Sequence, residues 1–389
     1  MVGLRAVTAG RQARPLARAK EGSVTRLKLA VIGTGHLGRI HARLLSEMSD
    51  VELVGVADPV QAAREKVAAE YGTRPFADHR ELLDLVDAAV VVTPTRTHHA
   101  VALDFLGRGI PLLVEKPLAA TVREADELVE AARRHGTILQ VGHIERFNPA
   151  FNAACAHVRQ PKYIDAVRAA GFTGRSMDIG VVHDLMIHDI DLVLSLVEAP
   201  LVRVDGISLA VLGEREDAAQ ARLEFADGCV ANLSASRVSY SEAPNRRMHL
   251  WSAEGFAAID FGDRSVRVVV PSAEVQAGEF DYQSLSAEAK AGFKERVFAD
   301  VLRLETVDVE PRNALADEQR DFVDAVRGGT LPRVTGQEGR DALAVAEAIL
   351  ASARGHRWQS RPASPHPILR GPHWHRSGAP ATPVRREAG

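Results

Sequence analysis

The stretch VVHDLMIHDID, residues 181–191, places four groups capable of chemistry among apolar residues. Asp184 and His188 are four residues apart, so on a helix they lie on the same face. A carboxylate beside an imidazole suits proton transfer or metal ligation. His183 and His188 are five residues apart and do not share a helix face. We therefore favour proton transfer by Asp184 and His188, and we predict no metal site.

Lys116 is a further candidate because it directly follows an apolar run, LLVE. Thr93, Pro94 and His98 follow another such run, AAVVV. Carboxyl ends of parallel strands meet at the sheet edge where open α/β folds bind ligands. By position alone, a lysine after a buried strand is by default a solvated loop charge. Beside a nicotinamide it would donate a hydrogen bond to a substrate hydroxyl and stabilise alkoxide character as hydride leaves.

The glycine-rich turn in LAVIGTGHLGRIHARLL predicts a dinucleotide-binding loop. Gly33, Gly35 and Gly38 form G-x-G-x-x-G between a strand and a helix, which brings a pyrophosphate to the helix N-terminus. Asp58 ends the next strand, where an acid hydrogen-bonds the ribose hydroxyls and favours NAD over NADP. Arg64 could instead accept a 2′-phosphate. The cofactor-binding residues that we predict are Gly33, Thr34, Gly35, His36, Leu37, Gly38, Asp58, Thr93, Pro94, His98, Glu115 and Lys116.

The elements that must position these residues alternate between Leu27 and Gly142. Short Val-, Ile- and Leu-rich runs are separated there by longer amphipathic segments. This pattern predicts an α/β Rossmann domain, a doubly wound parallel sheet covered by helices on both faces. Gly72, Gly109 and Gly136 each follow a helical segment and suit left-handed caps.

After Asn148 the pattern changes to that of a second domain. We expect a helix from Pro149, irregular sequence, the His/Asp helix, and then strands in LVRVDGISLAV, AQARLEFADGCVANLSASRV, RRMHLWSAEGFAAIDF and RSVRVVVP. Such runs predict an open, largely antiparallel sheet of an α+β domain. Two late helices, ADEQRDFVDAVRGG and GQEGRDALAVAEAILASA, are expected to close this domain.

These patterns divide the chain into four parts. We predict a Rossmann domain over 27–147, a substrate-binding and oligomerisation domain over 148–355, and disordered segments over 1–26 and 356–389. The Arg- and Ala-rich first segment superficially resembles an organellar targeting peptide, and a translation start near Val24 is a further alternative.

Composition narrows the class of protein. A chain of 389 residues is longer than one hydrophobic core usually serves, so two domains are expected. Its net charge of −3 gives no electrostatic attraction to nucleic acid. Cys155 and Cys229 lie far apart in sequence and match no metal-ligand spacing, which suits a reducing compartment. No apolar run approaches the roughly 20 residues that a membrane span needs. We therefore expect a cytoplasmic protein with neither nucleic acid nor membrane as a partner.

Four motifs occur in order: GTGHLG at 33–38, TP-x-x-x-H at 93–98, EKP at 115–117 and D-x-x-x-H-D-I-D at 184–191. Together they resemble the glucose–fructose oxidoreductase, inositol dehydrogenase and MocA (Gfo/Idh/MocA) family, from about Leu27 to Ser352. The resemblance implies a Rossmann domain plus an open-sheet domain. It also implies reversible NAD(P)-dependent oxidation of a sugar or cyclitol hydroxyl, and a homo-oligomer, dimer or tetramer, formed through the second sheet.

The same resemblance implies a catalytic set of Lys116, Asp184 and His188. His188 would take the hydroxyl proton, Asp184 would orient the ring or hold a neighbouring hydroxyl, and Lys116 would polarise the reacting oxygen. Many relatives carry Gly midway between the Asp and His, whereas this chain has Met186. His183 is additional, either a polar residue of the substrate pocket or a structural histidine.

Two stretches, VGHIERFNPAF at 141–151 and HDLMIHDIDLVLSL at 183–196, resemble members that oxidise a nucleotide sugar, UDP-N-acetylglucosamine, at its 3-hydroxyl. On this interpretation His143, Glu145, Arg146 and Asn148 lie at the mouth of the site, and Arg146 pairs with an anionic substrate group. Alternatively, Asn148 simply caps the helix that Pro149 begins. The predicted substrate-binding residues are Lys116, Arg146, Asn148, His183, Asp184 and His188.

Other functions on the same fold stay open at this point. A free-sugar or inositol dehydrogenase would use the same residues, and a glycosidase would use NAD only transiently and release no net NADH. A sugar-sensing protein without chemistry is the third alternative, and the presence of Lys116, Asp184 and His188 speaks against it. Fold alone does not separate these functions.

Overall fold

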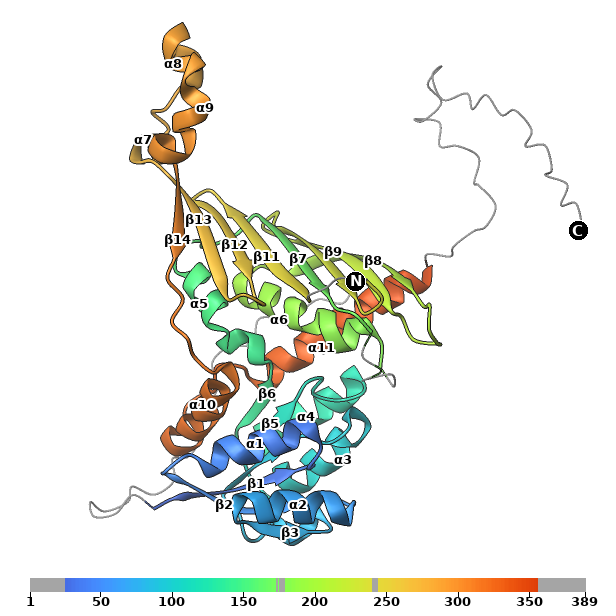
Figure 1. Ribbon diagram of the computed structural model, residues 1–389. Coiled ribbons are helices and arrows are strands. Elements are labelled where there is room, and N and C mark those ends of the chain that lie inside the picture. Colours follow the sequence, from blue (N-terminus) through green and yellow to red (C-terminus); the bar gives the residue numbers. More distant parts are fainter. Residues whose placement is uncertain (1–24, 173, 175–178, 240–243, 356–389) are drawn as a thin grey trace, which may run out of the picture.

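The computed structural model describes residues 25–172, 174, 179–239 and 244–355. The segments predicted to be disordered, 1–26 and 356–389, lie outside these residues except for Thr25 and Arg26. Two sheets stand one above the other, with helices α5 (Pro149–Cys155), α6 (Ile187–Leu196) and α11 (Gly336–Gly355) between them (Figure 1).

The first sheet confirms the predicted doubly wound architecture. Its six strands are all parallel, in the order β3-β2-β1-β4-β5-β6. The short strand β3 was not predicted, because its three residues are largely exposed and include a proline. The strands are β1 (Leu27–Ile32), β2 (Val51–Ala57), β3 (Arg74–Phe76), β4 (Ala88–Val91), β5 (Leu112–Glu115) and β6 (Leu139–Gly142).

Helices on both faces of this sheet return the chain between parallel strands. Gly72 and Gly136 end their helices in the left-handed conformation, and Gly109 also has positive φ, as the sequence predicted. The helical elements are α1 (His36–Ser46), α2 (Gln61–Tyr71), η1 (His79–Leu82), α3 (Thr95–Leu106), α4 (Val122–His135) and η2 (Ile144–Phe147).

The second sheet is mixed, with eight strands in the order β14-β13-β12-β11-β7-β10-β9-β8. Every neighbouring pair is antiparallel except β7 with β10. The strands are β7 (Tyr163–Ala169), β8 (Leu201–Leu209), β9 (Ala218–Phe225), β10 (Val230–Ser236), β11 (Asn245–Ser252), β12 (Gly255–Asp260), β13 (Ser265–Pro271) and β14 (Leu302–Val307).

Strand β7 corrects the prediction of irregular sequence after the helix that begins at Pro149. It lies inside the sheet, between β11 and β10. Its buried positions are Ile164, Ala166 and Arg168. Alternation of period two is present there, but a small residue and a charged residue at two of the three inward positions weaken the apolar signal.

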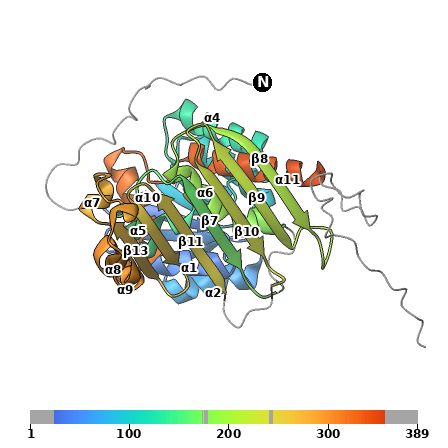
Figure 2. The same cartoon turned by 90° about the horizontal axis from the view of Figure 1, so that it is seen from above.

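One face of this sheet packs on α5 (Pro149–Cys155), α6 (Ile187–Leu196) and α11 (Gly336–Gly355) and forms the largest core cluster with them. Seen from above, the strands lie over these helices, and no helix of the described residues covers the outer face (Figure 2). None of the described helices has the length and apolar character needed to cross a bilayer.

Helix α10 (Ala314–Gly328) corrects the expectation that both late helices close the second domain. Its apolar side, Phe322, Val323 and Val326, belongs to the core cluster of the first domain. The chain therefore returns to the Rossmann domain after completing the second sheet (Figure 1). Helix α11 contacts both cores, because Leu343 packs in the first and Ala346 in the second.

Between β13 and β14 the chain forms a projecting arm (Figure 1). None of the residues in its helical elements is buried. These elements are α7 (Ala273–Gln276), η4 (Tyr282–Ser284), α8 (Ala287–Ala291), α9 (Phe293–Arg296) and the π-helical turn η5 (Val297–Val301).

Candidate active site

The glycine-rich loop between β1 and α1 fits a dinucleotide. Gly33 has φ +100°, and a Cβ there would lie 2.5 Å from the Val92 carbonyl oxygen. A Cβ on Gly38 would lie 2.0 Å from the carbonyl oxygen of Gly33, whereas a Cβ on Gly35 would meet nothing within 4 Å. The first and third glycines therefore serve the chain's own packing, and the middle one leaves open space for a phosphate.

The N-terminus of α1 offers donors to that phosphate. Gly35 is the N-cap, and no side chain of the described residues caps this end. The main-chain amides of His36, Leu37 and Gly38 have no acceptor within the helix, because the first intrahelical hydrogen bond is donated by the Arg39 amide. These three amides therefore point out of the helix end. Together with the helix dipole they suit the pyrophosphate of a dinucleotide.

Asp58 lies at the carboxyl end of β2, beside the glycine-rich loop. One carboxylate oxygen accepts a hydrogen bond from the Thr34 amide and the other from the Val60 amide, both at 2.8 Å. The Arg64 guanidinium donates to the carbonyl oxygens of Asp58 and Pro59 at 3.2 and 3.1 Å. The carboxylate is therefore held where ribose hydroxyls can donate to it and where a 2′-phosphate would be repelled.

His98 links the segments that follow β4 and β5. Its two ring nitrogens lie 2.9 Å from the Pro117 carbonyl oxygen and 2.8 Å from that of Thr93, and its side chain is buried. Burial lowers its pKa below the ordinary value, against the effect of the two carbonyls. Because its ring contacts the main chain of both segments, His98 positions the loop around Pro94 and the EKP turn.

Lys116 and Asp184 meet across the two domains. The Lys116 ammonium donates to the Asp184 carbonyl oxygen at 2.8 Å and to its carboxylate at 3.1 Å. Asp184 belongs to a π-helical turn, η3 (Val182–Met186), which continues directly into α6. The predicted helix is therefore wider in its first turn, a feature frequent at functional sites. Two groups 68 residues apart in sequence thus occupy one site.

His188 follows in the first turn of α6 and packs against a second imidazole. The rings of His188 and His143 are edge to face, with centroids 6.5 Å apart. Burial, and then the Lys116 charge, lower the pKa of His188 well below its ordinary value and that of His143 to about 3. The His188 Nδ1 has no hydrogen-bond partner among the described residues. His188 is thus a neutral imidazole that is able to accept a proton.

A buried ion-pair network supports the helix that carries His188. Arg168 on β7 contacts Asp189 at 2.7 Å and Glu145 at 2.7 Å. Burial opposes the charge on Arg168, but the two acids raise its pKa above the ordinary value. The network joins β7, α6 and the segment after β6, and the sequence analysis did not identify Arg168. The available signal was an arginine on the inward face of an alternating strand.

The structure corrects the expectation that the residues after β6 lie at the mouth of the site, because all four are buried: His143, Glu145, Arg146 and Asn148. Arg146 donates to Glu338 at 2.6 Å and to the Arg333 carbonyl oxygen at 3.2 Å. These contacts favour a structural role over pairing with a substrate anion.

Asn148 and His183 also have partners within the protein. Asn148 is the N-cap of α5 and accepts a hydrogen bond from the Ala150 amide at 3.0 Å, as the alternative interpretation expected. His183 lies 3.1 Å from a carboxylate oxygen of Glu347 on α11. The predicted residues that the structure brings together across the domains are therefore Lys116, Asp184 and His188.

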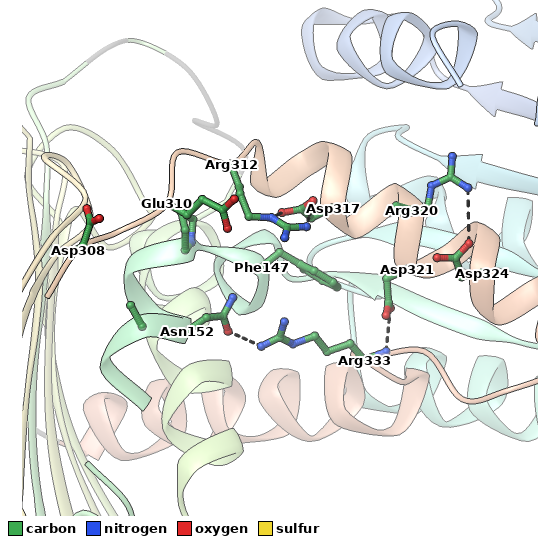
Figure 3. A pocket seen from close by; sticks show the side chains of 12 residues that line it. Phe147, Asn152, Asp308, Glu310, Arg312, Asp317, Arg320, Asp321, Asp324 and Arg333 are labelled. Atoms are coloured by element: carbon green, nitrogen blue, oxygen red, sulfur yellow. Dashed lines mark hydrogen bonds and ion pairs between the residues drawn. The ribbon is translucent and has the colours of Figure 1, made fainter. Parts of the chain in front are cut away.

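A separate cavity of about 660 Å³ lies between α5, the β14–α10 connection and α10. Several of its polar side chains already have partners within the protein: in Figure 3 the Arg333 guanidinium donates to Asn152, the Arg333 main-chain amide donates to Asp321, and the Arg320 guanidinium donates to Asp324. None of the predicted catalytic residues lines it. We therefore assign the chemistry to the site of Lys116 and His188.

Comparisons with known proteins agree with this geometry. Residues 27–143 match the model of an oxidoreductase family with an NAD-binding Rossmann fold, and residues 150–257 match that family's GFO/IDH/MocA C-terminal domain. The chain is 36% identical over 325 residues, 82% of its length, to the UDP-N-acetylglucosamine 3-dehydrogenase of Acidithiobacillus ferrooxidans, of which 95% is covered.

A solved structure of that dehydrogenase superposes with a TM-score of 0.74 at 35% identity, covering 85% of this chain and 98% of that one. The NAD-dependent scyllo-inositol 2-dehydrogenase of Bacillus subtilis is 31% identical over 55% of this chain and 68% of its own. Both relatives are named as dehydrogenases, but they are named for different substrates.

Proposed function

The chain belongs to the Gfo/Idh/MocA family of NAD-binding oxidoreductases, and from this premise we propose that it oxidises the 3-hydroxyl of UDP-N-acetylglucosamine or a similar nucleotide sugar. The observation that carries the catalytic assignment is the contact of the Lys116 ammonium with Asp184, one helical turn before His188. The three side chains place a hydrogen-bond donor, an acid and a neutral base at the carboxyl edge of the Rossmann sheet.

The chemistry is removal of a hydride from carbon and a proton from oxygen, which leaves a ketone. NAD, when bound, supplies the hydride acceptor. Lys116 donates a hydrogen bond to the reacting oxygen and stabilises the negative charge that develops there. His188 takes the hydroxyl proton, which its low pKa permits because the ring is neutral before reaction. Asp184 holds the ammonium in place and accepts from a neighbouring hydroxyl.

The nucleotide-sugar assignment has two supports. The relative at 36% identity is named for this substrate, and the match covers nearly all of its length. The stretch at residues 141–151 also carries the sequence resemblance to such members, and His143 within it packs directly on His188. The competing assignment, a free-sugar or inositol dehydrogenase, follows from the weaker and shorter match to the inositol enzyme.

A substrate panel tests the proposal. Purified protein with NAD is mixed with UDP-N-acetylglucosamine, other UDP-sugars, free hexoses and inositols, and absorbance of reduced nicotinamide is followed in the presence of a keto-sugar trap. We expect signal with UDP-N-acetylglucosamine, which His188→Ala abolishes. Signal only with free sugars or inositols would refute the nucleotide sugar. Release of an aglycone without net NADH would show a glycosidase.

We also propose that the enzyme is a cytoplasmic homo-oligomer that assembles through the outer face of the second sheet. Alternation places the ring cluster of Tyr163, His249, Trp251 and Phe256 on that face, with centroids 4.8 to 5.6 Å apart. The free thiols of Cys155 and Cys229 are compatible with a reducing compartment. Light scattering of the wild type and Trp251→Glu tests the assembly, and a monomeric wild type would refute it.

A further inference from the structure

A buried polar cluster lies beneath the EKP turn, outside the set of groups described so far. It combines His41 of α1, Glu115 of β5 and Glu318 of α10, whose donor and acceptor atoms lie within 4.8 Å of one another. All three side chains are buried. The cluster is therefore the place where α10, which the chain adds only after the second sheet, touches the strand end that carries Lys116.

Glu115 is the centre of this cluster. One carboxylate oxygen lies 3.0 Å from the His41 Nε2, and the other accepts a hydrogen bond from the Lys116 amide at 3.2 Å. A Cβ on Gly142 would lie 2.9 Å from the Glu115 carboxyl carbon, so the neighbouring strand leaves room for this carboxylate only because glycine stands there. Glu115 thus fixes the main chain at the catalytic lysine.

The tautomer of His41 follows from its second partner. The Gln319 side-chain amide donates to the His41 Nδ1 at 2.7 Å. A neutral imidazole that accepts at Nδ1 carries its proton at Nε2, and this N–H therefore donates a hydrogen bond to Glu115. This leaves Glu115 with two donors and places Gln319, also on α10, behind the imidazole.

Glu318 stands apart because neither of its carboxyl oxygens has a hydrogen-bond partner in the described part of the chain, although the side chain is completely buried. The acids that face it come from three elements: Glu115 of β5, Asp191 of α6 and Asp321 of its own helix. No lysine or arginine of the described residues forms an ion pair with it. A carboxylate in this position would be a desolvated charge among other acids.

We propose that Glu318 is a neutral carboxylic acid whose hydroxyl group donates a hydrogen bond to Glu115, and that it thereby positions the catalytic Lys116. Burial, and then the charge of Glu115, raise the pKa of Glu318 well above its ordinary value, which agrees with this protonation. The resulting chain runs from Glu318 through Glu115 to the Lys116 amide. The positioning role rests on the proposed function of Lys116, whereas the location of the proton does not.

A divalent cation is the competing occupant, since one imidazole and two carboxylates are a plausible ligand set. The two alternatives require different protonation states of Glu318. A neutral acid is mimicked by glutamine, whose amide donates a hydrogen bond to Glu115. A cation requires the carboxylate, so glutamine at this position would release it.

Three variants separate these alternatives: Glu318→Gln, Glu318→Ala and, as a control, Asp324→Asn, which removes an exposed carboxyl from the same helix. We expect Glu318→Ala to lower kcat by about 10- to 100-fold through misplacement of Lys116, with little change in NAD affinity. Glu318→Gln and Asp324→Asn should stay within about threefold of wild type. Equal damage from Gln and Ala would overturn the proton assignment, and so would a stoichiometric metal in the wild type that Gln removes.

Urea unfolding from pH 5 to 9 tests the proton without any substrate. Because the folded pKa of Glu318 is raised, its contribution to stability is full at low pH and is lost as pH rises toward the folded pKa. Relative to wild type, Glu318→Gln should therefore gain about tenfold in folding equilibrium constant for each pH unit between the ordinary pKa of a glutamate and the raised pKa of Glu318. A pH-independent difference would overturn the proposal even if the substrate panel fails, and Asp324→Asn should show no such gain.

Discussion

Replacing Lys116 with Met tests the catalytic assignment directly. The substitution keeps a long apolar stem and removes only the ammonium, which now donates to the carbonyl oxygen and carboxylate of Asp184. These contacts link the Rossmann domain to the turn before His188. The variant therefore loses a donor to the reacting oxygen and leaves the Asp184 carboxylate beside the site without its cation.

The expected effect on rate is much larger than the effect on stability. Loss of one pre-positioned donor to a developing oxyanion costs about 2.7 to 4 kcal/mol, or about 100- to 1,000-fold in kcat. The side chains of Lys116 and Asp184 are 17% and 24% exposed, so the pair is only partly screened by solvent. We expect about 1 to 2 kcal/mol of lost stability, a small shift in Tm for a chain of this size.

The assay compares the wild type with Lys116→Met, Asp184→Asn and the double variant, using NADH absorbance for kcat and fluorescence titration for NAD affinity. If Lys116 acts on the substrate oxygen, the double variant stays as slow as Lys116→Met. If Lys116 only neutralises Asp184, the double variant recovers. A kcat for Lys116→Met within tenfold of wild type, with the fold intact by circular dichroism, would refute our reasoning.

Three further predictions follow from the same geometry. Asp58→Ala should weaken NAD binding or relax the choice against NADP, because the carboxylate at the end of β2 is lost; unchanged titrations with both cofactors would place the ribose contact elsewhere. Because the pKa of His188 is well below 6.5, protonation should remove activity only at lower pH, so kcat/KM should be flat from pH 6.5 to 8; an acid limb centred at 6.5 or above would contradict this. Arg168→Met should cost about 3 kcal/mol or more in urea unfolding by leaving two buried acids unpaired, and a loss below 1 kcal/mol would show the network to be dispensable.

The sequence predicted the first domain well because its signals are local. A G-x-G-x-x-G turn, an acid at the next strand end and glycines after helices each depend on neighbouring residues, and the structure confirms the parallel sheet and its left-handed caps. The short sequence separation of Asp184 and His188 was equally local, and the structure places them in consecutive turns, η3 and the start of α6. The period-two signal of β7 was missed because Ala166 and Arg168 occupy inward positions.

By itself, the sequence determined the kinds of groups available and their order along the chain: the dinucleotide loop, the lysine after β5, the acid just before α6 and the base in its first turn. Only the tertiary structure decided which of them meet. It joins Lys116 to Asp184, buries Arg146 against Glu338, and returns α10 to the Rossmann core, where Glu318 faces Glu115. The physical reason is that contacts between residues far apart in the chain follow from how apolar faces of helices and sheets pack together. The spacing of residues within one helix or strand does not predict which elements pack together.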